Sequence, residues 1–468
     1  MLASAICTQG QTPAIFSATT RLVEVNVIAT DKNGPVEGLT KGDFVIYDNG
    51  KKQNAAVFEM NARRASDRPG QPAQVLAPNE FTNRPATGPA EQGNAIMVVW
   101  DMLNTSFEDQ IRARPAVLQS LRVIRPGDHV GVCILGTFVS VLQDFTSDSS
   151  QLIATLDKYA KWPDVGYVLP ETRIERTRQA AWEIGNHLAR VRGRKSVIWI
   201  SAKSPVGLFG ADFAIYMVDA RAIPGFPGIR AAADNGTRTA FDSPPTYDDG
   251  SSMPNSPDRE LMKQIAASTG GAAFTWGNDI RGAIDRAMTD ADVTYTLGFY
   301  AEAPAPPAKP YHELKVQVKR RGVDVHYRKS YQTIPYAPPP RRLVADAIAS
   351  AIDSTQIAIG ARLESNGPPL GIPVTIGAGD IVFAGTPARR TGAVDLIVTQ
   401  RAAGGAELDT VSRSLAIDVD GQNYDEFLKQ GIRATIELAP QPGLAEVKVV
   451  VLDRNSGHVG SLTIPIKL

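Results

Sequence analysis

The chain has 468 residues, of which 43% are hydrophobic and 21% are charged, as is usual for folded globular proteins. This length exceeds what one hydrophobic core organises, so we expect about three domains. Basic and acidic residues number 49 each, which excludes a global attraction to nucleic acid, and no nucleic-acid partner is expected. No apolar run reaches the roughly 20 residues of a transmembrane helix.

The first 60 residues contain a short leading segment and then β-strands. Residues 1–15 are small and apolar before they turn polar, which fits either the end of a secretory signal or a disordered start, and Cys7 leaves a lipid anchor open. Within residues 16–60, alternating patterns predict strands at 22–28, 44–47 and 55–58. Asn49-Gly50 favours a hairpin turn between the last two strands. Residues 61–93 lack periodicity and are interpreted as a linker.

A different pattern begins at residue 94. The apolar run at 96–100 predicts a strand that is buried on both faces of a parallel sheet. Buried-strand and helical segments then alternate, which predicts a doubly wound, mostly parallel α/β domain over residues 94–300. The strand at 138–142 follows its predecessor too closely for a crossover helix, so it should be an antiparallel edge strand. Residues 221–257, rich in Pro, Gly, Asp and Ser, indicate a surface insertion. The expected helices are 107–124, 148–159, 173–191, 259–268 and 279–290, and the further buried strands are 130–135, 197–200 and 214–218.

The remainder of the chain is predominantly β. Residues 301–332 predict a Pro-rich connector and a hairpin of 314–318 with 323–327, which we expect to share a β-sandwich with residues 16–60 because neither piece has enough strands alone. Residues 333–341 are interpreted as a linker. Residues 342–468 begin with a helix at 343–352 and continue as a β-sandwich of immunoglobulin or fibronectin type. Its expected strands are 357–363, 372–376, 394–400, 433–438, 447–452 and 462–466.

Several short motifs occur in an order typical of one family. They include Gly38-Leu-Thr-Lys-Gly-Asp-Phe44, Asp101-Met-Leu-Asn-Thr105, Gly193-Arg-Lys-Ser-Val-Ile-Trp-Ile-Ser201, Tyr216-Met-Val-Asp-Ala-Arg221 and Tyr295-Thr-Leu-Gly-Phe-Tyr300. Over residues 16–332 the chain resembles the von Willebrand factor type A-related domain family that is widespread in acidobacteria. The resemblance implies a type A-like α/β domain that acts in binding outside the cytoplasm.

Type A domains often carry a metal-ion-dependent adhesion site that begins with the pattern D-x-S-x-S. Asp101 and Thr105 match two of its ligand positions, but Leu103 replaces a hydroxyl ligand. The later aspartate is replaced by a Ser-Ala-Lys sequence whose Lys203 would repel a cation, and Thr172 is the nearest candidate for the later threonine. We therefore expect no cofactor and no tight Mg²⁺ binding. Asp101 would instead be a helix N-cap or a hydrogen-bonding loop residue.

Ligands of doubly wound sheets bind at the carboxyl ends of the strands, which places the expected ligand-binding face at Asp101, Asn104, Thr105 and Ser106. The predicted function is non-enzymatic: an extracytoplasmic adhesion or binding protein that recognises a protein or cell-surface ligand. A divalent-cation-dependent adhesion protein that uses Asp101 and Thr105 is one alternative. An enzyme that uses the crevice at the strand ends is another, although no phosphate-binding, hydrolase or metalloprotease motif is present and no catalytic residue is assigned. The ligand and the oligomeric state stay open.

Overall fold

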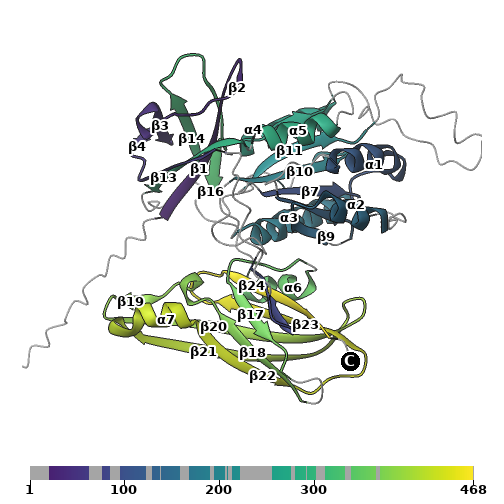
Figure 1. Ribbon diagram of the computed structural model, residues 1–468, viewed down its shortest axis with the longest axis vertical. Helices are drawn as coiled ribbons and strands as arrows, with labels where there is room; N and C mark the ends of the chain where they lie inside the picture. The colour runs from purple at the N-terminus through teal and green to yellow at the C-terminus, as the bar shows by residue number, and fades with distance from the viewer. Residues whose placement is uncertain are drawn as a thin grey trace, which may run out of the picture.

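The polypeptide forms three units (Figure 1). The computed structural model describes residues 21–62, 76–84, 95–122, 129–137, 139–158, 168–189, 194–205, 208, 213–221, 256–275, 280–290, 292–301, 311–332, 339–350, 352–364 and 369–466. Some predicted segments lie outside these residues. They are the start at 1–15 and most residues of the insertion at 221–257, of the connector at 301–310 and of the linker at 333–341. None of the described helices is long and apolar enough to cross a membrane.

The central unit is a six-stranded sheet in the order β12-β11-β10-β7-β8-β9. Neighbouring strands are parallel except for β8 and β9, which are antiparallel. The prediction of a doubly wound, mostly parallel sheet with an antiparallel edge strand is therefore confirmed. The strand bounds are β7 (Ala95–Asp101), β8 (His129–Leu135), β9 (Val139–Thr146), β10 (Lys195–Ser201), β11 (Ala214–Asp219) and β12 (Ala273–Phe274).

Helices cover both faces of this sheet, as the continuous apolar character of its strands requires. One buried cluster joins the sheet to α1, α2 and α5, and a second cluster on the opposite face joins it to α3 and α4. The Ser106 hydroxyl begins α1 by accepting a hydrogen bond from the amide of Asp109, and Gly270 ends α4 with a left-handed φ of 81°. The helices are α1 (Phe107–Leu121), α2 (Ser149–Lys158), α3 (Pro170–His187), α4 (Pro257–Thr269) and α5 (Ile280–Asp290).

The second unit is a β-sandwich built from both ends of the predicted type A region. One sheet has the order β15-β1-β13-β5, with β2 beside β1, and the other has the order β16-β14-β3-β4. Strand β3 pairs with β14, so the two segments expected to share a sandwich do pair. The strands are β1 (Arg21–Asp31), β2 (Gly34–Pro35), β3 (Phe44–Asp48), β4 (Lys51–Gln53), β5 (Val57–Ala62), β13 (Val293–Ala301), β14 (Tyr311–Val318), β15 (Asp324–His326) and β16 (Ser330–Gln332).

Three pairings in this sandwich differ from the expectation. Strand β13 lies between β1 and β5, so the α/β domain ends before it and not at residue 300. Strand β15 pairs with β1 and not with β14, so 314–318 and 323–327 do not form a hairpin. Asn49 and Gly50 do form the turn, with φ of 47° and 80°, but they join β3 to the short β4. The alternation of apolar and polar residues indicates which face of a strand is buried, but it does not indicate which strand it pairs with.

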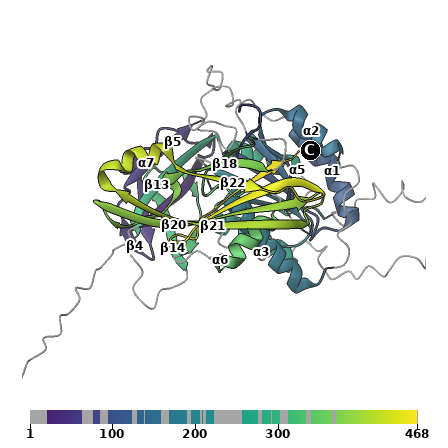
Figure 2. The ribbon, with the colours of Figure 1, turned by 90° about the horizontal axis from the view of Figure 1, so that it is seen from below.

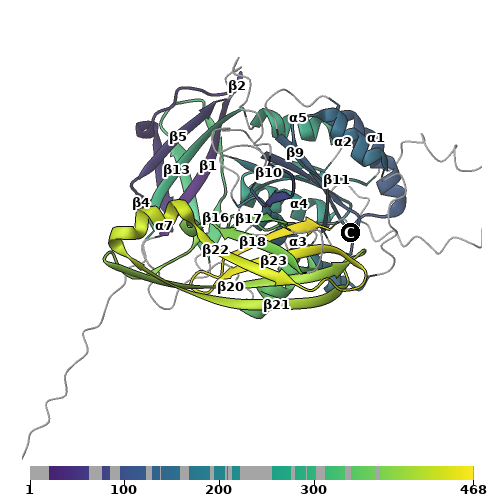
Figure 3. The ribbon, with the colours of Figure 1, turned by 60° about the horizontal axis from the view of Figure 1, so that its bottom comes forward.

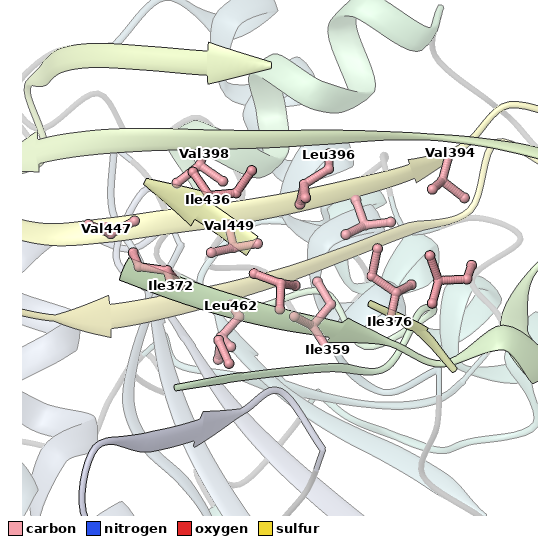
Figure 4. Packing of buried hydrophobic residues seen from close by; sticks show 14 of the residues in the cluster. Ile359, Ile372, Ile376, Val394, Leu396, Val398, Ile436, Val447, Val449 and Leu462 are labelled. Atoms are coloured by element: carbon pink, nitrogen blue, oxygen red, sulfur yellow. The ribbon is translucent and has the colours of Figure 1, made fainter. Parts of the chain in front are cut away.

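The C-terminal unit is a sandwich of the sheets β22-β18-β17-β6 and β19-β20-β23-β24, with β21 beside β20. Apolar side chains of both sheets, among them Ile372, Leu396 and Val449, point into the space between them (Figure 4). Residues 80–82, predicted as part of a linker, form β6 and pair with β17. Figures 2 and 3 show the long strands β20 and β21 at the outer side of this unit. Its elements are α6 (Pro340–Ala349), β6 (Glu80–Thr82), β17 (Ile359–Arg362), β18 (Leu370–Ile376), β19 (Ala384–Thr386), β20 (Arg389–Ala402), β21 (Glu407–Asp420), α7 (Tyr424–Gln430), β22 (Ile432–Leu438), β23 (Leu444–Asp453) and β24 (Val459–Pro465).

Candidate functional site at the carboxyl ends of the parallel strands

Asp101 ends β7 and is fully buried. Its Oδ1 accepts a hydrogen bond from the Asn104 amide N–H at 3.0 Å, and its Oδ2 accepts bonds from Asn104 Nδ2 at 2.8 Å and Trp199 Nε1 at 2.9 Å. The Ser201 hydroxyl donates to the same Oδ2 at 3.0 Å. Burial raises the pKa of Asp101 above its ordinary value, although the hydrogen bonds from Trp199, Asn104 and Ser201 oppose this. Asp101 is therefore a loop hydrogen-bonder, and both of its oxygens have partners within the protein.

Two further polar residues of the loop after β7, Asn104 and Thr105, form hydrogen bonds to neighbouring elements. Asn104 Nδ2 lies 3.1 Å from the hydroxyl of Thr177 in α3, and the Thr105 hydroxyl accepts a bond from the Ala202 amide at 3.0 Å. The threonine of α3 that contacts this loop is thus Thr177, whereas among the described residues no hydrogen bond joins Thr172 to it. Sequence reasoning missed Thr177 because nothing in its local pattern distinguishes it from other helix threonines.

The predicted ligand-binding face is therefore largely closed. Asp101, Asn104 and Thr105 are all buried, and only Ser106 is exposed. The Ser106 hydroxyl serves as the helix cap, because it accepts from the Asp109 amide at 3.2 Å and donates to Asp109 Oδ2 at 2.7 Å. Side chains from neighbouring elements bind the polar groups of Asp101, Asn104 and Thr105 internally, and the expected ligand-binding face stays a prediction.

These residues do not fit a hard divalent cation. Such an ion needs about six oxygen ligands, whereas Asp101 faces the indole N–H of Trp199 and the amide N–H₂ of Asn104, which are donors. Leu103 occupies a hydroxyl-ligand position and packs into the hydrophobic cluster under α3 and α4. Within the described ranges, no group of three or more His, Cys, Asp or Glu side chains is arranged to hold a metal ion.

A second polar cluster lies at the end of β11, which β10 separates from β7. Asp219 is buried and accepts bonds from Arg221 Nε at 2.8 Å and Arg259 Nε at 2.7 Å. The Ser204 hydroxyl donates to Asp258 Oδ1 at 2.6 Å, which links the loop after β10 to the start of α4. Two arginines thus engage both carboxylate oxygens of Asp219. Like Asp101, Asp219 connects segments at the carboxyl ends of the strands and is not exposed to solvent.

Exposed apolar side chains lie around these closed clusters. Phe107 and Ile111, one turn apart on α1, are 60% and 54% exposed, and Leu169 and Ile174 at the start of α3 are 57% and 49% exposed. Thr177, which bonds to the loop before α1, lies two turns inside α3. The two apolar pairs lie at the starts of helices that cover opposite faces of the sheet, and both starts lie toward the carboxyl ends of the parallel strands, where ligands of this fold class bind.

No protein-family model and no curated protein sequence matches the chain. Among solved structures, an aerotolerance-related membrane protein from Bacteroides fragilis is 14% identical, with 42% of this chain and 98% of that chain covered and a TM-score of 0.28. The von Willebrand factor domain of the type V pilus tip protein Mfa5 from Porphyromonas gingivalis is 15% identical, with 24% and 38% covered and a TM-score of 0.20. A von Willebrand factor type A protein from Catenulispora acidiphila is 9% identical, with 76% and 72% covered and a TM-score of 0.27. The similar structures thus include von Willebrand factor type A proteins, at values that transfer no function to this chain.

Proposed function

We propose that this chain is a non-enzymatic binding protein that recognises a protein or cell-surface ligand through the end of its α/β sheet, without a metal ion. We also propose that it acts outside the cytoplasm and belongs to the acidobacterial family that its motif order indicates. The observation that carries the proposal is the exposed apolar group Phe107, Ile111, Leu169 and Ile174, named here the apolar rim. Apolar patches bordered by polar residues are typical of protein-interaction surfaces.

The polar residues inside the rim support binding over chemistry. A general base or nucleophile needs a lone pair that can reach a substrate. Asp101 accepts bonds from three side chains and a backbone amide, and Asp219 is engaged by two arginines. Neither carboxylate is thus free to accept a substrate proton. The same saturation disfavours the alternative of a cation-dependent adhesion site at Asp101 and Thr105.

The test is capture of partners from the native envelope fraction. The wild-type chain is compared with Phe107→Ser/Ile111→Ser, and a matched control carries Tyr300→Ser, which removes a side chain that is 56% exposed on the N-terminal sandwich. We expect the rim variant to lose the partner, whereas the control retains it with or without EDTA. Capture that is unchanged in the rim variant, or abolished by EDTA, would refute the proposed site.

A further inference from the structure

The C-terminal end of α3 is bound by the C-terminal sandwich. Thr355 donates its backbone amide and its hydroxyl to the carbonyl oxygen of Asn186 at 3.1 and 3.0 Å, and its hydroxyl also lies 2.9 Å from the carbonyl oxygen of His187. Trp182 of the same helix packs against an apolar cluster that includes Leu343 of α6. Helix ends leave carbonyl groups unpaired, so Thr355 acts as a cap supplied by another unit. This contact surface is named here the α3 interface.

His187 faces two acceptors across this interface. Its Nδ1 lies 2.9 Å from the carbonyl oxygen of Asp353, and its Nε2 lies 3.0 Å from Oδ1 of Asp144 in β9. A carbonyl oxygen and a carboxylate can only accept, so both ring nitrogens must carry a proton for both bonds to form. The side chain of His187 is 9% exposed, which makes loss of either bond costly, while Asp144 is 57% exposed. The geometry therefore requires the imidazolium form.

Glu183 lies one helical turn before His187 on the same interface. Its carboxyl group accepts bonds from the hydroxyl of Ser350 and from Gln179 Nε2, each at 3.0 Å. Both donors are neutral, and no ion pair of Glu183 with Lys or Arg occurs among the described residues. Burial favours the protonated form of Glu183, although the hydrogen bonds from Ser350 and Gln179 oppose this. The other titratable or charged groups that face Glu183 and His187 are Cys133 of β8, Asp144 of β9, Asp346 of α6, Asp353 and Lys448 of β23.

We propose that the α3 interface is a proton-operated latch, in which the C-terminal sandwich stays docked while His187 is doubly protonated and Glu183 is neutral, and loosens as both lose a proton. Both groups lie on one face of one helix, so their effects act on one contact. Thr177, in the middle of α3, contacts the loop at Asp101. Release of the C-terminal sandwich would thus free the helix that also supports the proposed binding edge.

The two titrations act in the same direction. Burial would lower the pKa of His187, but the hydrogen bond and charge of Asp144, with those of Asp353, raise it above 6.5. Burial raises the pKa of Glu183 from 4.5 to about 7. A raised pKa stabilises the docked state at low pH, so the Glu183 contribution is lost between pH 4.5 and about 7 and that of His187 above pH 6.5. Asp144 and Asp353 have lowered pKa values and stay charged throughout this window.

Hydrogen–deuterium exchange of the full chain between pH 5 and pH 8, corrected for intrinsic exchange rates, tests the latch. We expect the opening equilibrium of peptides around Thr355 and the end of α3 to rise roughly a hundredfold with pH, as a shift of two or more pKa units implies. Peptides from β7 and β10, inside the α/β sheet, should not follow this rise. Equal protection of the α3 interface at pH 5 and pH 8 would overturn the proposal.

Two variants separate the contributions. Glu183→Gln mimics the neutral acid, so at pH 8 its interface should be better protected than that of the wild type, with only the His187 contribution lost. His187→Gln cannot become a cation, so it should lower protection already at pH 5. His312→Gln is the matched control, because His312 Nδ1 makes a comparable bond, 2.7 Å to Asp48 Oδ1, inside the N-terminal sandwich. An unchanged pH profile in Glu183→Gln, or a His312→Gln profile that shifts like that of His187→Gln, would refute the latch.

Discussion

The indole N–H of Trp199 donates to Oδ2 of Asp101 at 2.9 Å and thereby connects two adjacent parallel strands. Strands β10 and β7 are the two central strands of the sheet, with Trp199 beside Val99, and the bond lies toward their carboxyl ends. Both side chains are almost fully buried. A buried donor that loses its acceptor costs free energy, so this pair makes Asp101 a structural residue.

Asp101→Ala should lower the free energy of unfolding by about 3 kcal/mol or more, because the Trp199 and Asn104 donors would remain buried without an acceptor. Urea denaturation measures the loss. The control Ser106→Ala removes the exposed cap of α1 and should cost about 1 kcal/mol. Similar small losses in both variants would show that Asp101 is not the structural centre of this edge.

Mg²⁺ and Mn²⁺ should give no saturable heat in calorimetric titration at micromolar concentrations, because the lone pairs of Asp101 are already engaged by donors. EDTA should likewise leave the midpoint of thermal unfolding unchanged. A micromolar isotherm that disappears in Thr105→Val would contradict this expectation and favour the cation-dependent adhesion protein instead.

Replacing Lys448 should lower the free energy of unfolding far more than replacing an exposed lysine. Its ammonium group is fully buried and donates to the carbonyl oxygen of Ser350, to Asp353 and to the Thr463 hydroxyl at 2.8 to 3.0 Å. Lys448→Met would leave Asp353 without its cation, at a cost of about 3 kcal/mol. Lys263→Met, at a side chain that is 51% exposed, should change stability by less than about 0.5 kcal/mol. Thermal unfolding of both variants decides this; equal midpoints would contradict it.

The positions of most strands could be predicted from local patterns, but their partners could not. The apolar run at 96–100 identifies a parallel strand because buried strands and helices alternate along the chain after it. Strand β13 comes directly after this alternation of strands and helices. It nevertheless pairs with β1, from which it is separated by more than 260 residues. Strand β21 was not predicted, since its side chains are mostly exposed and polar and therefore lack the alternation that marks a half-buried strand.

At the candidate site, too, some features could be predicted from the sequence and others could not. Its location at Asp101 and the misfit with a metal follow from the residues at 101–105 and from Lys203. The burial of the site does not, because its donors Trp199 and Thr177 come from β10 and α3, and only the sheet order brings them to Asp101. Side chains that act across elements leave no periodic signal in their own segments.

Gly271 follows the residue that ends α4 and should tolerate no side chain. A Cβ atom at this position would lie 2.0 Å from the carbonyl oxygen of Ile215 in β11, which is backbone that cannot rotate away. The Gly271 amide also donates to the carbonyl oxygen of Ala266 at 3.0 Å, so the turn after α4 is held from both sides. Gly271→Ala should therefore displace the turn from β11 and lower the free energy of unfolding by about 3 kcal/mol. Gly360→Ala is the matched control, because its Cβ would meet open space, and it should change stability by less than about 0.5 kcal/mol. Urea denaturation of both variants provides the comparison, and a Gly271→Ala midpoint equal to that of Gly360→Ala would show that this close approach does not constrain the fold.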